Sequence, residues 1–390
     1  MGTVIIKNIG TVFSGDMKHP VISGASVVVM RDKKIAAVGG EDVAAQYAGQ
    51  PDTTVVDADG ASLAPGLIDS HCHVALGDYA PRQKTLDFID SALHGGVTTC
   101  ISAGECHVPG RPKDPAGVKA MAIFMHKSFT NARPSGVKVH GGAVILEPGL
   151  TEADFVEMAK EGCWIVGEVG LGAVNRPDSA APMVAMAKKH GFKVQMHCGG
   201  TSIPGSSTVT AQDVISTAPT VVSHVNGGPT AISQTEVDTL VDKTSLVLEI
   251  VQCGNVKIAD HVARRLRDKG ALDRLIFGND APSGTGIIPL GILRNIAQTA
   301  ALSGISAGEC IAAATGNTAR TYGLNTGIIA PDREADVLII DAPMGSVGQD
   351  AAGAIEAGDL PAVAMVFIDG EVKVKKSRNT PPPKRHPKFL

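Results

Sequence analysis

Short apolar runs alternate with amphipathic segments through the middle of the chain. Eight runs rich in Val, Ile and Leu each end near glycine or a polar residue, at 66–74, 97–104, 137–145, 164–170, 193–200, 221–228, 246–254 and 275–282. Apolar residues recur at helical spacing in segments between them, at 151–162, 181–191, 233–244 and 258–270. Continuous apolar runs are typical of parallel strands that are buried on both faces. The pattern therefore predicts an α/β protein built on a parallel (β/α)8 TIM barrel.

The predicted helices carry start and stop signals. Two of them begin with capping-box pairs, Thr151 with Asp154 and Ser233 with Glu236. Glycines suited to ending a helix follow three of them, at Gly162, Gly191 and Gly270. These signals support helices at the positions that the apolar spacing indicates.

The two ends of the chain have a different pattern, with short β-rich pieces broken by Gly, Asp and Asn. We expect them to pair into one small discontinuous β-sandwich domain, formed by residues 1–64 and 326–375. The barrel then spans residues 65–325. The basic, proline-rich segment 376–390 is expected to be an arm that is solvated or lies against a subunit.

Composition narrows the class of protein. Hydrophobic residues make up 44% of the 390 residues and charged residues 19%, which indicates a globular chain. A net charge of −4 gives no reason to expect nucleic acid or an anionic membrane as a partner. No apolar run reaches the ~18 residues of a membrane-spanning helix. The seven cysteines form no CxxC pair, so we expect reduced thiols in a cytoplasmic protein.

Histidines and carboxylates stand near the ends of the first, fourth, fifth, sixth and eighth predicted strands. They are His71, His73, Glu168, His197, His224 and Asp280. Residues two apart in a strand share a face, so the rings of His71 and His73 point the same way. Chemistry in a (β/α)8 barrel lies at the carboxyl ends of the strands. Because imidazole and carboxylate bind divalent ions such as zinc and iron, the six residues predict a site for two cations.

Each residue also has a structural explanation when it is taken alone. A single buried histidine is more often a hydrogen-bonded core residue than a ligand. Glu168 and Asp280 are each equally well explained by a structural ion pair. His140 ends the third strand and would face the same mouth, where orienting a substrate and packing are equally good explanations. Asp69, two residues before His71, either supports that ring or packs inward.

The six residues, in this order, resemble the metal-dependent amidohydrolase superfamily. That family has HxH on strand 1, a bridging carboxylate or carboxylated lysine on strand 4, His on strands 5 and 6, and Asp on strand 8. The resemblance implies that Glu168 bridges two ions. The implied ligands are His71, His73 and Asp280 for one ion, and His197 and His224 for the other. It also implies attack on a carbonyl by a hydroxide held between the ions, with Asp280 as the general acid and base.

Stretches at the barrel mouth, among them "GGTSIPGSSTVTA" and "FGNDAPSGTG", resemble a narrower group of this family that opens a lactam ring in anaerobic nicotinate degradation. This resemblance implies hydrolysis of 1,4,5,6-tetrahydro-6-oxonicotinate to 2-formylglutarate and ammonia. It further implies a homotetramer whose two divalent ions are Zn2+ and Fe2+. The alternatives are another cyclic amidohydrolase, of adenine-deaminase or hydantoinase type, and a non-catalytic scaffold of the same fold.

A substrate of this kind carries a carboxylate, so the mouth should offer a cation or a cluster of N–H groups. Arg82, Thr201 and Ser202 are the candidates for substrate binding, together with His140. Arg82 is equally well explained as a solvated residue in the first turn of a helix. Other cations in the same loops are Lys84, Arg111 and Lys113.

Overall fold

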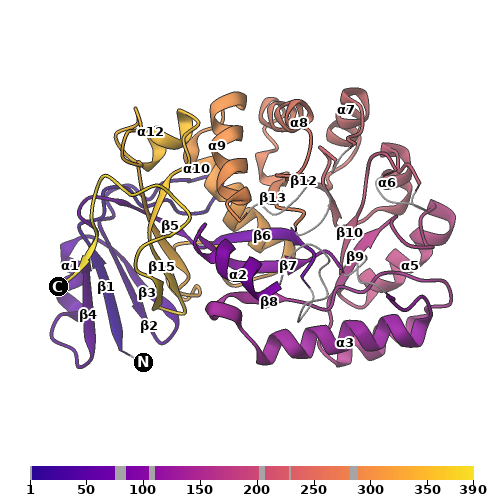
Figure 1. The fold of residues 1–390 in the computed structure, drawn as a ribbon, viewed down its shortest axis with the longest axis horizontal. Helices are drawn as coiled ribbons and strands as arrows, with labels where there is room; N and C mark the ends of the chain where they lie inside the picture. Colours follow the sequence, from indigo (N-terminus) through magenta and orange to yellow (C-terminus); the bar gives the residue numbers. More distant parts are fainter. Residues whose placement is uncertain (1, 75–84, 105–109, 202–206, 228–229, 282–288) are drawn as a thin grey trace.

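The computed structural model describes residues 2–74, 85–104, 110–201, 207–227, 230–281 and 289–390. A barrel surrounded by helices occupies one side of the molecule, and a smaller two-layered β domain occupies the other (Figure 1). Both chain termini lie on the small domain. Every helix in the described ranges is too short or too polar to traverse a lipid bilayer.

Eight parallel strands close the barrel, which confirms the predicted fold class. A three-stranded sheet, in the order β6-β7-β8, and a five-stranded sheet, in the order β13-β12-β11-β10-β9, supply these strands. Parallel bridges between Val144 and Val166 and between Cys72 and Ala281 join the two sheets on either side. The strands are β6 (Leu67–Cys72), β7 (Val97–Ser102), β8 (Lys138–His140), β9 (Ile165–Val169), β10 (Lys193–Met196), β11 (Val221–Val222), β12 (Val247–Val251) and β13 (Leu275–Gly278).

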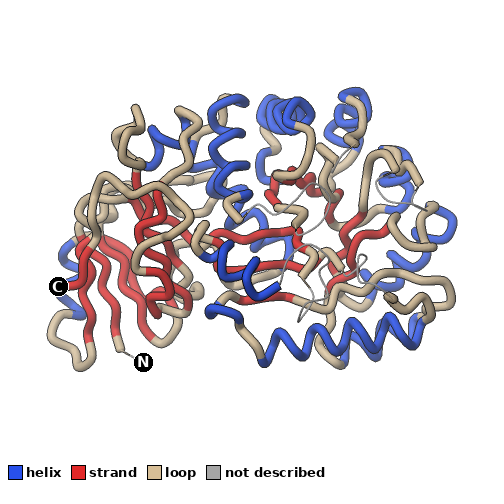
Figure 2. The backbone as a smooth tube through the Cα atoms, in the orientation of Figure 1, coloured by secondary structure: helices blue, strands red, loops and turns tan. Residues whose placement is uncertain are grey.

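Helices surround these strands (Figure 2). They are α2 (Thr85–Leu93), α3 (Pro115–Asn131), α4 (Glu152–Lys160), α5 (Pro177–Lys189), α6 (Ala211–Thr217), α7 (Gln234–Lys243), α8 (Val256–Asp268) and α9 (Gly291–Ser303). Both predicted capping boxes are confirmed, at the start of α4 and of α7. The three predicted stop glycines all have positive φ, at 96° for Gly162, 83° for Gly191 and 63° for Gly270.

Short helical segments link the barrel to the small domain. After α9 the chain forms α10 (Ala307–Ala312), a π-helical turn (Ala313–Asn317) and α11 (Thr318–Tyr322). Residues from these turns, Ala319 and Tyr322, pack on Ile68, Ile101 and Ile276 from barrel strands in a separate buried cluster. The remaining helices are α1 (Glu41–Tyr47), α12 (Ala351–Glu356) and the 3-10 turns Pro134–Gly136 and Leu272–Arg274.

The small domain consists of two sheets that draw strands from both ends of the chain. One sheet has the order β17-β4-β1-β2-β3 and the other β16-β15-β14-β5. The N-terminal strands are β1 (Thr3–Lys7), β2 (Val27–Arg31), β3 (Lys34–Gly39), β4 (Thr53–Asp57) and β5 (Ser62–Pro65). The C-terminal strands are β14 (Val337–Asp341), β15 (Ala362–Ile368), β16 (Glu371–Val374) and β17 (Lys388–Phe389). The division of the chain at residues 64, 325 and 375 stays our proposal, and these shared sheets support it.

One strand pair of the small domain is parallel, although short strands separated by turn residues favour antiparallel pairing. Strands β1 and β4 are parallel, with Ile5 opposite Val55. The connection that contains α1 brings the chain back to the starting end of β1, and such a crossover allows parallel pairing. A buried core that includes Ile6, Ile339 and Phe367 joins the two sheets.

The basic C-terminal segment lies against its own chain. Its strand β17 pairs antiparallel with β4. The guanidinium of Arg385 lies 2.5 Å from the carboxylate of the fully buried Asp341, and the Lys384 ammonium donates to the carbonyls of Ser346 and Gly348. The segment therefore covers the edge of a sheet, which a sequence pattern of prolines and cations does not reveal.

A partly buried cation, with 16% of its side chain exposed, links the barrel to the small domain. Lys138, at the start of β8, places its Nζ atom 2.6 Å from Glu334 Oε2, 2.7 Å from Asp336 Oδ2 and 3.0 Å from Asp369 Oδ1. Burial raises the pKa of Asp336 although Lys138 opposes that shift. Removing the ammonium would leave the carboxylate of Asp336 buried without its counter-ion.

We expect Lys138→Met to lower the free energy of unfolding by about 3 kcal/mol, the cost typical of breaking a buried ion pair. Urea denaturation measures this change. Lys127→Met is the matched control, because Lys127 pairs with Glu161 at the surface, with half of its side chain exposed, and such pairs contribute at most about 1 kcal/mol. Equal stability of the two variants would contradict the assigned role of Lys138.

Candidate metal centre

The six residues singled out from the sequence come together at the carboxyl ends of the barrel strands. His71 lies in β6 and Glu168 in β9, while the other four lie one or two residues beyond the ends of β6, β10, β11 and β13. All six are buried, with exposed fractions from 0% at His71 to 8% at Asp280. Two groups have ligand atoms close enough to share an ion: His71, His73 and Asp280, and His71, Glu168 and His224.

Asp280 faces both histidines of the HxH pair. Its Oδ1 atom lies 3.2 Å from His73 Nε2 and 3.6 Å from His71 Nε2. The backbone amide of Asp280 donates to the carbonyl of His71 at 2.9 Å, which holds the end of β13 against β6. The first and last strands of the barrel thus bring these three side chains to one point.

Glu168 lies between the two groups of ligands. Its Oε2 atom is 3.4 Å from His73 Nε2. Its Oε1 atom is 3.7 Å from His71 Nε2, 2.6 Å from His224 Nε2 and 3.8 Å from His197 Nδ1. Because its two oxygens face different histidines, this carboxylate has the arrangement that a bridging ligand needs.

Hydrogen bonds on the far side of the rings orient both histidines of the HxH pair. His71 Nδ1 lies 2.7 Å from Glu249 Oε2, and His73 Nδ1 lies 2.8 Å from the carbonyl oxygen of Gly104. Since a carboxylate and a carbonyl only accept, each Nδ1 is the protonated nitrogen. The Nε2 lone pairs then face the centre of the cluster, as metal-binding imidazoles require.

Two of the six residues have backbone conformations that L-residues rarely adopt. The φ angle is +34° at His224 and +56° at Asp280. Left-handed conformations of non-glycine residues are unfavourable by about 1–3 kcal/mol and gather at functional sites. The surrounding structure holds both residues in place, which supports a functional role for them.

The residues present fit divalent metal ions. Among the described residues, three buried ring nitrogens of the cluster lack a hydrogen-bond partner: His71 Nε2, His197 Nε2 and His224 Nδ1. Three buried carboxylates, of Glu168, Glu249 and Asp280, lie within the same network. Unpaired imidazole nitrogens next to concentrated negative charge are the donor set that zinc or iron prefers.

The charges of the cluster depend on one another. Burial alone would raise the pKa of Glu168, but His71 and hydrogen bonds from His197 and His224 hold it well below its usual value. The same balance keeps the pKa of Asp280 low, with a hydrogen bond from His73 as the main opposing effect. Burial alone would lower the pKa of His71, but Glu249 and Glu168 hold it well above its usual value. The site therefore stabilises positive charge between its carboxylates.

Asp69 and Glu249 are two further carboxylates, which contact the ligand residue His71. Asp69 accepts from the amides of His71 at 3.2 Å and Asn279 at 2.9 Å, so it links β6 to β13. Burial raises the pKa of Asp69 to about 7. Sequence reasoning missed Glu249, although the single carboxylate inside the apolar run "LVLEIV" was a usable signal.

Two of the four expected substrate-binding residues, Thr201 and His140, lie within the described part of the chain. Arg82 and Ser202 lie outside the described residues, and Thr201 is exposed. His140 does not join the cluster. It lines a cavity of about 260 Å³ with Lys138 and Glu334, and its ring packs against Trp164. Strand β8 ends at His140, but the chain runs on along the barrel wall and bridges to β9 at Val144. His140 therefore lies below the mouth rather than at it.

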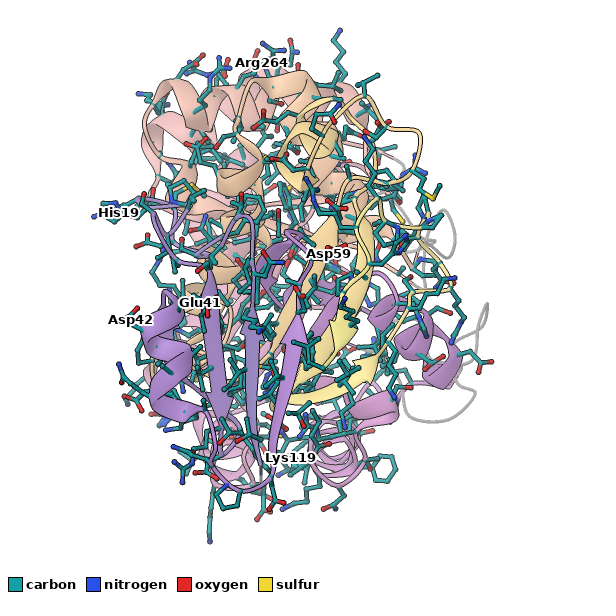
Figure 3. The ribbon with its side chains drawn as sticks, turned by 90° about the vertical axis from the view of Figure 1, so that its left-hand side faces the viewer. His19, Glu41, Asp42, Asp59, Lys119 and Arg264 are labelled. Carbon is teal, nitrogen blue, oxygen red and sulfur yellow. The ribbon has the colours of Figure 1, made fainter. Side chains whose placement is uncertain are left out.

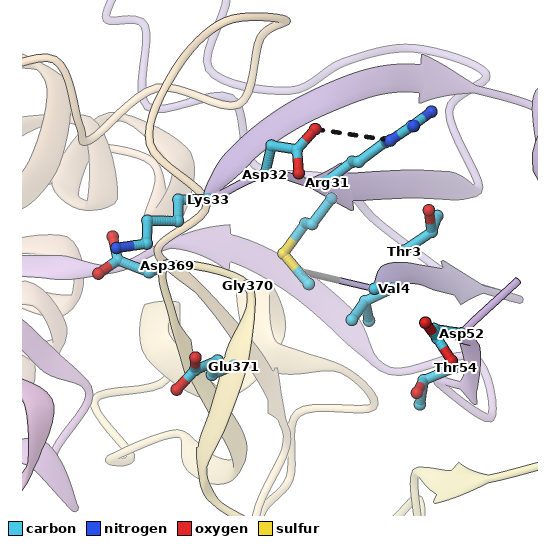
Figure 4. A pocket seen from close by; sticks show the side chains of 12 residues that line it. Thr3, Val4, Arg31, Asp32, Lys33, Asp52, Thr54, Asp369, Gly370 and Glu371 are labelled. Atoms are coloured by element: carbon cyan, nitrogen blue, oxygen red, sulfur yellow. Dashed lines mark ion pairs between the residues drawn. The ribbon is translucent and has the colours of Figure 1, made fainter.

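Several other ionisable residues and cysteines lie away from the candidate metal centre. A cavity of about 290 Å³ in the small domain has Asp32, Asp52 and Glu371 in its lining but none of the six candidate ligands (Figure 4). Arg31 pairs with Asp32 there at 3.6 Å. His19 projects from the edge of the molecule (Figure 3). Cys72 and Cys198 are neighbours of candidate ligands in the sequence, but they belong to the apolar core cluster.

Comparison with known proteins agrees with this geometry. The profile of the Amidohydrolase family matches residues 62–373. Enamidase of Eubacterium barkeri is 65% identical over 390 residues, with all of both chains covered. An imidazolonepropionase of Clostridium tetani is 25% identical, covering 88% of this chain and 92% of the relative. An adenine deaminase of Bacillus velezensis is 24% identical over 78% of this chain, which spans half of that protein.

Solved structures give the same result. The crystal structure of enamidase, described as a member of the amidohydrolase superfamily, superposes over all of both chains with a TM-score of 0.96 and 64% identity. A β-aspartyl dipeptidase of Fervidobacterium islandicum shares the fold, with a TM-score of 0.67 at 17% identity over 96% of this chain and 98% of the other. With the barrel, the strand-end ligand set and these matches in agreement, the chain belongs to the amidohydrolase family.

Proposed function

We propose that this protein is an enamidase-type hydrolase that opens a cyclic amide at its C–N bond. Its substrate is 1,4,5,6-tetrahydro-6-oxonicotinate, and its products are 2-formylglutarate and ammonia. The observation that carries the proposal is the buried set of four histidines and two carboxylates at the barrel mouth. The 65% identity to enamidase along the whole chain supports the choice of substrate.

His71, His73 and Asp280 would hold one divalent ion, and His197 and His224 the other, with Glu168 between them. We assign the two ions as Zn2+ and Fe2+, both of which suit imidazole and carboxylate ligands. Bound here, the ions would polarise the lactam carbonyl and lower the pKa of water to near neutrality.

Asp280 is the group that moves the proton. Its depressed pKa keeps it ionised at neutral pH, so that it can accept a proton from the attacking water. It then returns the proton to the ring nitrogen as the C–N bond breaks. The product of ring opening is an enamine, and a second water molecule converts it to the aldehyde and ammonia.

The substrate's carboxylate needs a partner at the mouth. We propose Arg82, which follows β6 in the sequence, together with Thr201 and Ser202, which follow β10. Arg111 is a weaker candidate, because its guanidinium already pairs with the buried carboxylate of Glu147 at 2.8 Å. We also propose a homotetramer, as the resemblance implies.

A substrate panel tests this function. The purified protein, assayed with the oxonicotinate lactam, adenine and hydantoin, should hydrolyse the lactam with a kcat/KM at least about 100-fold higher than the others, the discrimination a site with specific polar contacts achieves. If adenine or hydantoin is hydrolysed faster than the lactam, the proposed substrate is wrong. Absence of turnover with bound metal would favour a scaffold.

Metal binding should weaken as the pH falls. Carboxylates raise the pKa of His71 and of His224 above the usual 6.5 by outweighing burial, and a metal must displace those protons. Protonation therefore competes already above pH 6.5. Chelator competition between pH 8.5 and 6 should show affinity falling about tenfold or more per pH unit at the acidic end. Constant affinity across this range would contradict the ligand assignment.

A further inference from the structure

Glu249 is a buried carboxylate that the proposed reaction does not use. It lies at the centre of β12, the one barrel strand between β11 and β13, and it is 0% exposed. A buried carboxylate is costly unless hydrogen bonds or charges stabilise it. The contacts of Glu249 therefore indicate its role in β12.

One oxygen of Glu249 contacts both groups of ligands. Its Oε2 atom lies 2.7 Å from His71 Nδ1 and accepts the backbone amide of His224 at 3.2 Å. Its other oxygen, Oε1, lies 2.5 Å from Ser70 Oγ, next to His71 in the sequence. The carboxylate thus touches β6, on one side of the cluster, and the loop after β11, on the other.

At His71 this contact determines which ring nitrogen carries the proton. A carboxylate accepts only, so the proton lies on Nδ1 and the lone pair of Nε2 faces Glu168 and Asp280. The negative charge also increases the basicity of the ring, which strengthens it as a ligand.

At His224, the contact with Glu249 stabilises an unfavourable backbone conformation. His224 has a φ angle of +34°, and its backbone amide donates to Glu249 Oε2. The carbonyl of Glu249 accepts the next amide, of Val225, at 2.8 Å. Side chain and main chain of Glu249 together therefore fix the turn that points His224 Nε2 at Glu168 Oε1.

We propose that Glu249 is a positioning residue shared by both halves of the metal centre. It fixes the tautomer of His71 and the backbone of His224, so that one carboxylate presets ligands of two ions. This inference rests on the proposed metal centre, and it concerns the chain's preorganisation for metal rather than the choice of substrate.

A graded pair of variants tests the role. Glu249→Gln keeps the shape and one accepting oxygen but loses the charge, while Glu249→Leu also removes the acceptor for His71. Zn2+ affinity of the metal-free chain, measured by chelator competition, should fall about tenfold in the first variant and about 100-fold in the second, the range found for residues that support metal ligands. Affinity is calculated per folded chain, from unfolding curves of the same samples.

Asp341→Asn is the matched control. Asp341 is also fully buried in a strand and loses an ion pair, with Arg385, but it lies in the small domain. It should lower stability without changing Zn2+ affinity. If both Glu249 variants bind Zn2+ as tightly as the wild type, Glu249 has only a structural role and the inference is wrong, while the metal centre stands. A wild-type chain that binds no metal overturns both.

Discussion

Asp280→Asn should lower kcat for lactam hydrolysis by about 100- to 10,000-fold, the contribution typical of a general acid and base. The asparagine side chain has nearly the same shape, but it cannot take a proton from water or deliver one to the leaving nitrogen. Its carbonyl oxygen can still face His73, whose Nε2 atom is 3.2 Å from Asp280 Oδ1 in the wild type. KM should therefore change much less than kcat.

Metal content separates this loss from loss of the ions. The variant is assayed at saturating metal, and elemental analysis of the same sample gives the bound ions per chain. Asp268→Asn, at the exposed end of α8, is the control and should keep full activity. A variant that holds its metal and keeps wild-type kcat would remove Asp280 from the chemistry.

Glu168→Gln should reduce the bound metal from two ions to one or fewer per chain. Glu168 is the side chain whose two oxygens face His73 on one side and His224 on the other. An amide offers one neutral oxygen in place of two that share a charge, so it cannot bridge two cations. Loss of about 4 kcal/mol of transition-state stabilisation lowers turnover about 1,000-fold.

The control for this change is Glu161→Gln, seven residues earlier and at the surface, where Lys127 pairs with it. It should retain two ions and normal turnover. Two ions per chain in Glu168→Gln would show that the bridge lies elsewhere and that the arrangement around Glu168 is structural.

Much of the barrel and its candidate ligands was predictable from the sequence, for a physical reason. Strands buried on both faces must be continuously apolar, so a polar residue at the end of such a run is conspicuous. His71, Glu168 and His224 all stand out in this way. Their spacing along the chain carries no information on distances, which only the closed barrel provides.

Other features depend on contacts that a sequence pattern does not express. Glu249 interrupts an apolar run, but its role depends on its contact with His71, which lies 178 residues away in the sequence. His140 looked like a residue at the barrel mouth, yet beyond two glycines the chain forms a further bridge to β9, at Val144, and His140 lies below the mouth. The C-terminal segment resembled a solvated arm because prolines and cations hide the pairing of β17 with β4.

The measurement that tests the central claim most directly is lactam turnover by one preparation as its metal is removed and then restored. The protein is treated with a chelator, and turnover of 1,4,5,6-tetrahydro-6-oxonicotinate is followed against the zinc and iron remaining on the chain. The account predicts that turnover disappears with the metal and returns when the ions are added back. Undiminished turnover by the metal-free chain would contradict it.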